Sequence, residues 1–244
     1  MTAPFLESIA QMHLPASCSY FDRYVVTGNF IPAQRELIFE EALSKQFDVL
    51  VMIDDDIVFP PDALERLIKT LEDDPQTGLV GALYYSRDGL RPMAVDRWNG
   101  EDTTTALVPA FDDSTAGIVD GVGFGCVAIR LSALTQLERP FLSAHIIIQR
   151  AQRLVRITDE DYLFCERLRR AGWKIRLHGG VRCRHYDRAL KSLIPAEWEA
   201  LSVTMHQRMY VRTDQGEALI EPDDSLPCGH EVHRAVTLDY VSVD

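Results

Sequence analysis

An apolar run that ends in three aspartates constrains the fold of this chain more than any other stretch. Residues 48–53, DVLVMI, are almost all apolar and rich in β-branched side chains, as is typical of a strand covered on both faces. Asp54, Asp55 and Asp56 follow directly. Because burying unpaired carboxylates is strongly unfavourable, we expect a positive partner beside them.

Helix and strand patterns alternate on both sides of this run. Such alternation predicts an α/β fold, a single domain with a mainly parallel central sheet flanked by helices. The expected helices cover residues 4–13, 31–47, 60–74, about 160–171 and about 195–206. The expected strands cover residues 23–28, 48–53, 78–85 and 174–179, with two strands around a glycine-rich turn within 118–134 and a hairpin at 208–220. Residues 86–117 are typical of a long loop.

Composition limits the function. The 244 residues, 46% of them hydrophobic, suffice for one α/β domain with an appendage. A formal net charge of -12 argues against nucleic acid as a partner. The five cysteines contain no C-x-x-C pair, which favours a reducing, cytoplasmic location. The chain has no signal-peptide pattern and no apolar run of about 18 residues, so we expect no membrane-spanning helix.

The aspartates stand where open α/β sheets bind ligands, beyond the carboxyl end of a strand. Asp54 and Asp56, at i and i+2, can direct their oxygens at one hard divalent cation such as Mg²⁺ or Mn²⁺. The alternative is a group of capping carboxylates before the helix in PPDALERL. Three carboxylates behind a buried strand favour the metal.

Four further blocks follow the Asp-x-Asp strand: PPDALERL, VDGVGFGCVAIR, DEDYLFCERLRRAGWKI and RCRHYD. In this order, between about Asn29 and Asp187, they resemble the GT-A glycosyltransferases, in particular the family-2-like group. The resemblance implies a GT-A-like domain at residues 1–188 and a short C-terminal helix and hairpin extension at residues 189–244. It also implies inverting transfer of a sugar from a nucleotide-diphosphate donor to a glycan, small-molecule or protein acceptor.

By this resemblance, the aspartates hold the donor. Asp54 and Asp56 contact its ribose and the Mn²⁺ or Mg²⁺ that bridges the diphosphate of UDP or GDP, with Asp56 as the direct ligand. Asp55 faces away or contacts the ribose. His185 matches a histidine that completes the metal shell in some members, and a structural role is the alternative. Arg35 matches an arginine beneath the nucleotide, and a surface ion pair is the alternative.

The acidic block resembles the family segment that supplies the general base. Asp161 is assigned to take the proton from the acceptor hydroxyl, with Glu160 in reserve. Carboxylates in the first turn of a helix also stabilise its dipole, and the two roles are compatible. In the family, the segment that holds Gly121, Gly123 and Gly125 borders the donor sugar and the acceptor. A β-bulge or turn is the alternative.

The chain departs from the family at its beginning. The family opens with a strand that forms the floor of the base pocket, whereas this chain opens with a helix pattern. Either that strand is missing, or the C-terminal tail or another subunit of an oligomer replaces it. Near the end, Cys228, His230 and His233 form either a zinc-binding group or an exposed loop.

Two other functions compete with glycosyl transfer. A nucleotidyltransferase also uses carboxylate-bound Mg²⁺, but it normally needs a basic, glycine-rich phosphate loop near the N-terminus, and none is visible. A non-catalytic glycan-binding or scaffold module derived from the GT-A fold would explain the missing strand. The retained Asp54, Asp56, Asp161 and His185 argue against such a module.

Overall fold

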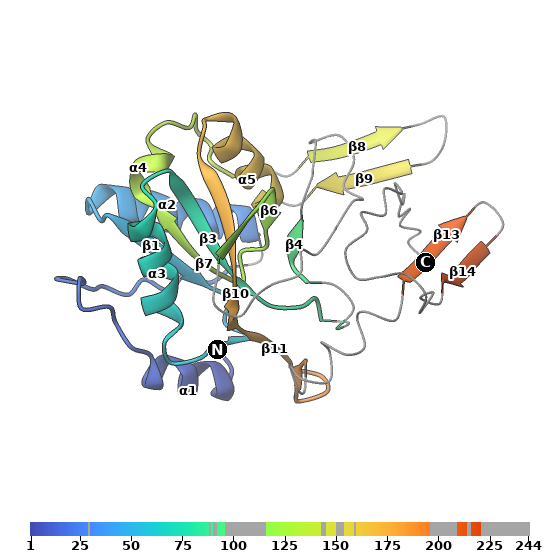
Figure 1. Ribbon diagram of the computed structural model, residues 1–244, viewed down its shortest axis with the longest axis horizontal. Helices are drawn as coiled ribbons and strands as arrows, with labels where there is room; N and C mark the ends of the chain where they lie inside the picture. The colour runs from blue at the N-terminus through green and yellow to red at the C-terminus, as the bar shows by residue number, and fades with distance from the viewer. Residues whose placement is uncertain are drawn as a thin grey trace, which may run out of the picture.

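A central sheet with helices on both faces forms the body of the protein (Figure 1). The computed structural model describes residues 1–28, 30–87, 89, 92–95, 116–142, 145–149, 154–158, 160–195, 209–213 and 216–220. The helices are α1 (Ala3–Gln11), α2 (Ile31–Ser44), α3 (Ala63–Asp73), α4 (Leu131–Leu134) and α5 (Glu160–Arg170). The main sheet contains β1 (Val49–Ile53), β3 (Thr77–Leu83), β5 (Ala116–Val119), β7 (Cys126–Arg130) and β10 (Lys174–Arg182).

The main sheet has the strand order β1-β7-β3-β10-β5. The α/β class is confirmed, but the expectation of a mainly parallel sheet is wrong. Among these described strands only β10 and β3 pair in parallel, and the other three pairings are antiparallel. β3 and β10 each follow a helix, as in βα units, whereas β7 follows the short strand β6 (Gly121–Val122) and inserts antiparallel between β1 and β3. The helix–strand alternation in the sequence therefore predicted only part of the connectivity of the main sheet.

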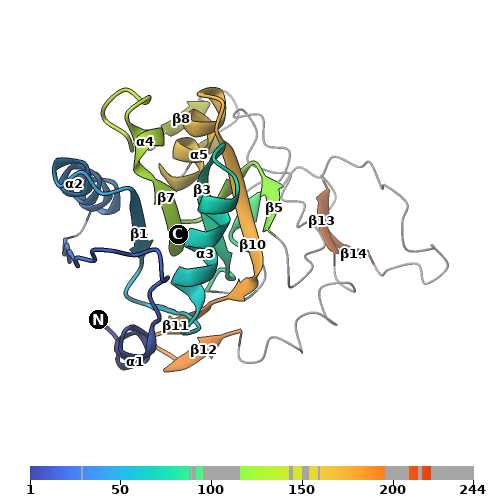
Figure 2. The ribbon, with the colours of Figure 1, turned by 60° about the vertical axis from the view of Figure 1, so that its left-hand side comes forward.

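Alternating side chains of the sheet divide the apolar interior into two layers. On β3, Leu79 and Leu83 face one layer, with Phe39 of α2 and Phe164 of α5. On the opposite face, Val80 and its neighbours pack against α3 and α1, a separation that is visible in Figure 2. α3 presents Leu64, Leu67 and Leu71, at helical spacing, to this second layer. The sheet is thus covered on both sides, which explains the apolar character of its strands.

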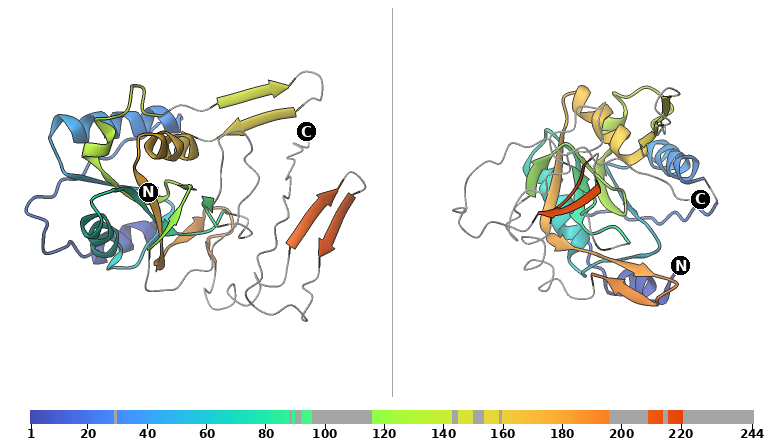
Figure 3. Two further views of the ribbon diagram at one scale, coloured as in Figure 1. Left: turned by 45° about the horizontal axis from the view of Figure 1, so that its top comes forward. Right: turned by 90° about the vertical axis from the view of Figure 1, so that its right-hand side faces the viewer.

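Smaller sheets surround the main one. β2 (Ile57–Val58), β11 (Arg184–Asp187) and β12 (Ser192–Ile194) form a three-stranded sheet, and β4 (Ala94–Val95) pairs with β6. Two further antiparallel ribbons, β8 (His145–Gln149) with β9 (Leu154–Thr158) and β13 (Met209–Thr213) with β14 (Gly216–Ile220), lie to one side in the left-hand view of Figure 3. The second ribbon confirms the predicted hairpin. The helix expected at 195–206 and the Cys228, His230 and His233 group lie outside the described residues.

The beginning of the chain contains the expected helix but lacks the expected strand. The helix predicted at residues 4–13 is confirmed as α1, which is capped by Thr2 and has proline in its first turn. The strand predicted at 23–28 is wrong, because these residues have no regular secondary structure. β1 is an edge strand, and no described strand pairs with its outer side. None of the described helices is long and apolar enough to cross a membrane.

Candidate active site

The positive partners expected beside the three aspartates are arginines. Each carboxylate of the run accepts a hydrogen bond from a different arginine, and these arginines come from three separate parts of the chain. The pairs are Asp54 with Arg35 at 3.2 Å, Asp55 with Arg188 at 2.6 Å and Asp56 with Arg87 at 2.5 Å. The negative charge at the end of β1 is therefore balanced by side chains of the protein itself.

Backbone hydrogen bonds fix the acidic run between two neighbouring segments. The amide of Asp54 donates to the carbonyl of Gly125 at 2.9 Å, which joins the run to the turn before β7. The carbonyl of Asp56 accepts from the amide of Tyr186 at 2.7 Å, which joins it to β11. The amide of Ile57 closes a turn onto the carbonyl of Asp54. The run is thus held between the glycine-rich turn and the strand that carries His185.

Arg35 is the centre of the site. Its side chain, only 10% exposed, donates to Glu160 at 2.6 Å and to Asp54 at 3.2 Å. The guanidinium also lies 5.3 Å from the centre of the Phe124 ring. Burial lowers the pKa of Arg35, but the charges of Asp54, Asp161 and Glu160 raise it above its ordinary value. Arg35 is therefore a fixed positive charge that joins the end of β1 to the beginning of α5.

The two acidic residues at the start of α5 have different surroundings. Glu160 is bound to Arg35. Asp161 is buried, and one of its carboxylate oxygens accepts from the amide of Tyr162 at 2.8 Å. The charge of Asp161 also acts on Arg35 and on Tyr84, which places all three in one electrostatic environment. The structure therefore brings Asp54, Glu160 and Asp161 together around Arg35.

Tyr84 is a buried side chain that packs against the site. Its hydroxyl accepts a hydrogen bond from the amide of Gly125 at 2.9 Å. Burial raises the pKa of Tyr84 well above its ordinary value, and the negative charges of Asp161 and Asp54 add to this effect. A Cβ atom on Gly125 would lie 2.7 Å from the Tyr84 ring, and one on Gly123 would overlap its hydroxyl. Glycine is thus required at both positions because Tyr84 packs directly against the turn.

Asp55 lies on the side of the run that faces α1. Its carboxylate binds Arg188 and the N-terminal ammonium group of Met1, at 2.6 and 3.0 Å. Thr2 donates to its backbone carbonyl. Burial raises the pKa of Asp55, but the hydrogen bonds from the ammonium group and from Arg188 lower it by more. Asp55 therefore fastens the first residues of the chain to the acidic run.

His185 forms a hydrogen bond of the kind that fixes the ring of a metal-ligating histidine. Its Nδ1 atom lies 2.5 Å from the carbonyl oxygen of Tyr85, so Nδ1 carries the proton and Nε2 keeps its lone pair. His185 and Asp54 are close enough to interact electrostatically, and the backbone of His185 pairs with Ile57 next to Asp56. Two carboxylates and one imidazole nitrogen suit Mn²⁺ or Mg²⁺ in their chemistry. Among the described residues, however, no three such side chains are already arranged as a metal cluster.

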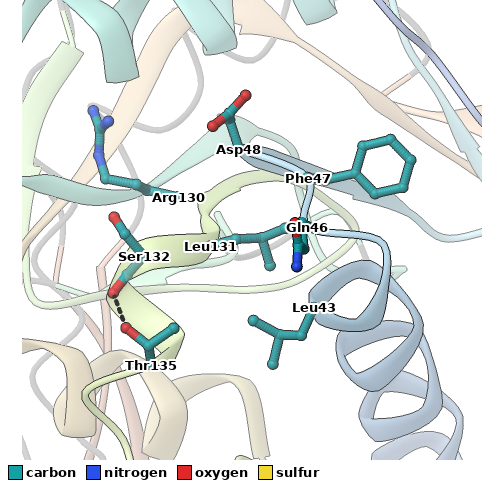
Figure 4. A pocket seen from close by; sticks show the side chains of 8 residues that line it. All are labelled: Leu43, Gln46, Phe47, Asp48, Arg130, Leu131, Ser132 and Thr135. Atoms are coloured by element: carbon teal, nitrogen blue, oxygen red, sulfur yellow. Dashed lines mark hydrogen bonds between the residues drawn. The ribbon is translucent and has the colours of Figure 1, made fainter.

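A pocket of about 340 Å³ lies away from these groups (Figure 4). It is formed by the end of α2, the start of β1, the end of β7 and α4, and its lining includes Asp48 and Arg130. Val49 pairs with Arg130, whereas Ile53 pairs with Cys126 at the opposite end of the same two strands. The pocket is therefore at the end of β1 remote from Asp54, and none of the predicted site residues lines it.

Three residues of the site were not predicted from the sequence: Tyr84, Arg87 and Arg188. Tyr84 and Arg87 follow β3 in the segment YYSR, directly beyond the carboxyl end of a buried strand. The same signal led to Asp54, so both residues were within reach of the sequence argument. Arg188 follows β11 just after the RCRHYD block, and nothing in the sequence indicates its contact with Asp55.

The central sheet is covered by helices on both faces, and carboxylates lie together beyond the end of β1. These features define an α/β domain of the GT-A-like class. The chain belongs to the family described as glycosyltransferase like family 2, whose profile matches residues 31–209. This confirms the resemblance inferred from the sequence blocks. Among solved structures, the crystal structure of A197 from STIV is similar, with 16% identity, a TM-score of 0.49 and coverage of 87% of this chain and 86% of that one. Among curated proteins, none matches this chain significantly.

Proposed function

We propose that this protein is an inverting glycosyltransferase that moves a sugar from a nucleotide-diphosphate donor, with UDP or GDP as leaving group, to an acceptor hydroxyl. One observation carries the proposal: buried Arg35 binds both Asp54 and Glu160. The carboxylate assigned to the donor and those assigned to the acceptor thereby share one site. Membership of glycosyltransferase family 2 agrees with this arrangement.

The donor side of the site consists of Asp54, Asp56 and His185, which would hold Mn²⁺ or Mg²⁺. When bound, the cation neutralises charge on the diphosphate leaving group. Arg35 keeps Asp54 at the end of β1, and the Nδ1 hydrogen bond to Tyr85 keeps His185 in one tautomer. Gly123 and Gly125 lack the Cβ atoms that would clash with Tyr84, so Tyr84 can pack against the turn on this side of the site.

On the acceptor side, Asp161 takes the proton from the attacking hydroxyl. Glu160 is less suited to this task, because its carboxylate is bound to Arg35 at 2.6 Å and would have to leave that ion pair to accept a proton. Asp161 stands at the start of α5, a rigid position from which a carboxylate can be aimed. The helix start also favours the ionised carboxylate that a base requires.

The proposal is tested by incubating the protein with Mn²⁺ and a panel of UDP- and GDP-sugars, with and without candidate acceptors, and measuring release of free UDP or GDP. We expect release with at least one donor, and we expect its loss in the Asp161→Asn variant. Absence of release with every donor, in a protein that still binds glycans, would favour the non-catalytic module.

A further inference from the structure

Arg87 is positioned differently from the other arginines of the acidic run. It follows β3 at the second position of a turn in which the amide of Gly89 donates to the carbonyl of Ser86 at 2.8 Å. From this turn its guanidinium reaches Asp56 at 2.5 Å. The Arg87 side chain is 69% exposed, whereas the Asp56 side chain is 8% exposed. A solvent-exposed arginine thus covers a buried carboxylate.

The ion pairs of Arg35 and Arg188 do not combine an exposed arginine with a buried carboxylate. Arg35 is as buried as its partner Glu160, so it is a fixed part of the interior. Arg188 and Asp55 are both largely exposed, so neither depends on the other for solvation. Of the three aspartates, Asp56 is the buried carboxylate whose arginine partner can move into solvent without unpacking the protein. Because a buried carboxylate is stable only beside a positive charge, Arg87 can leave only if another cation replaces it.

We propose that Arg87 and the divalent cation compete for Asp56, and that Arg87, once displaced, binds the phosphates of the donor. This inference rests on the proposed function. A divalent cation on Asp56 repels the guanidinium that it replaces. The released guanidinium stays beside the site, because its turn is anchored by the pairing of Tyr85 with Pro92. Its planar set of N–H donors matches the oxygens of a diphosphate.

The consequence is that metal binding at this site depends on the nucleotide. Without a donor, Arg87 keeps Asp56 neutralised and lowers the affinity for free Mn²⁺. With a nucleotide diphosphate present, the phosphates bring two negative charges that attract both the cation and Arg87, so metal and nucleotide bind together more tightly than either does alone. Arg87 is thus a donor-binding residue as well as the resident partner of Asp56.

The experiment measures Mn²⁺ binding in the absence of nucleotide, by electron paramagnetic resonance of free Mn²⁺, for the wild type, Arg87→Gln and Arg139→Gln. Arg87→Gln should bind Mn²⁺ roughly three- to tenfold more tightly, because the competing charge is gone. Arg139→Gln, which removes the same charge from an exposed ion pair with Glu40 outside the site, should match the wild type. Equal or weaker Mn²⁺ binding by Arg87→Gln would overturn the competition.

A second titration measures UDP or GDP binding at saturating Mn²⁺. We expect Arg87→Gln to lose affinity on the order of tenfold, as for a charge-assisted hydrogen bond, with Arg139→Gln unchanged. Arg87→Lys keeps the charge on Asp56 but lacks the planar fork, so it should resemble the wild type toward Mn²⁺ and lose nucleotide affinity. Unchanged nucleotide affinity in both Arg87 variants would overturn the phosphate contact. If the wild type itself binds neither nucleotide with Mn²⁺, the proposed function fails instead.

Discussion

The guanidinium of Arg35 lies 2.6 Å from the Glu160 carboxylate, although 125 positions separate the two residues in the chain. Because Arg35 also binds Asp54, this ion pair joins the first turn of α5 to the end of β1. We therefore assign Glu160 to aligning the site and the neighbouring Asp161 to proton transfer. The two acidic residues should respond differently to substitution.

We expect Asp161→Asn to lower turnover by about 10²- to 10⁴-fold, since the amide keeps the shape of the side chain but cannot accept the proton. Donor and metal affinity should stay near the wild type, as for an interaction made only in the transition state. Steady-state kinetics with a donor and acceptor found by nucleotide release, together with calorimetry of donor binding, measures both. Full transfer by Asp161→Asn combined with its loss in Glu160→Gln would assign the base to Glu160.

Arg35→Ala should destabilise the folded protein by about 3 kcal/mol, because it leaves the nearly buried carboxylate of Glu160 without its positive partner. Urea unfolding followed by circular dichroism gives this difference. Arg139→Ala is the matched control: Arg139 pairs with Glu40 at 2.9 Å, but both side chains are exposed, so the loss should stay below about 1 kcal/mol. Equal losses in the two variants would show that Arg35 does not hold the site together.

The fold could be predicted from the sequence wherever local pattern and packing agree. α3 was predicted because its apolar residues recur at helical spacing, and β1 and β3 because short, nearly continuous apolar runs are typical of strands covered on both faces. The pairing of β7 between β1 and β3 could not be predicted, because strand order depends on contacts between distant residues. Residues 23–28 have the apolar, β-branched character of a strand, but no described strand pairs with them, so propensity alone did not produce one.

The acidic residues of the candidate site were predictable, whereas of its arginines only Arg35 was identified from the sequence. Asp54 and Asp161 belong to sequence blocks whose residue types and order can be read directly from the sequence. Their partner Arg35 was noted, yet its contact with Glu160 depends on how α2 packs beside α5. The ion pair between Asp56 and Arg87 likewise depends on β3 and β1 ending at the same edge of the sheet. Charge compensation is thus a property of the tertiary structure.

Asp74 provides a test of pH dependence away from the site. It joins α3 to β3, and hydrogen bonds from Arg176 and Lys174, at 2.9 and 3.0 Å, lower its pKa below the ordinary value of 3.8. A lowered pKa in the folded state means that the ionised carboxylate favours folding. This contribution is complete above the pKa of the unfolded chain and is lost as the pH falls below it, toward the lower pKa of the folded state.

Asp74→Asn should therefore lower the urea midpoint at pH 7 and pH 5, and the difference from the wild type should shrink steadily below about pH 4. Asp73→Asn is the control, because Asp73 pairs with the exposed Lys69 one helical turn away and with no other cation in the described part of the chain. Its effect should be smaller than that of Asp74→Asn at pH 7. A difference for Asp74→Asn that persists unchanged at pH 3 would show that the effect does not arise from ionisation.

Calorimetric titration of UDP and GDP, with Mn²⁺ or with EDTA, into the wild type and Asp56→Ala tests the central claim, that the end of β1 binds a nucleotide diphosphate through a divalent cation. Asp74→Asn serves as control, since it removes one negative charge elsewhere on the protein. We predict binding by the wild type and Asp74→Asn with Mn²⁺, and no binding with EDTA or by Asp56→Ala, because the phosphates would then face Asp54 without a cation between them. Nucleotide binding that is unchanged by Asp56→Ala or by EDTA would contradict the account.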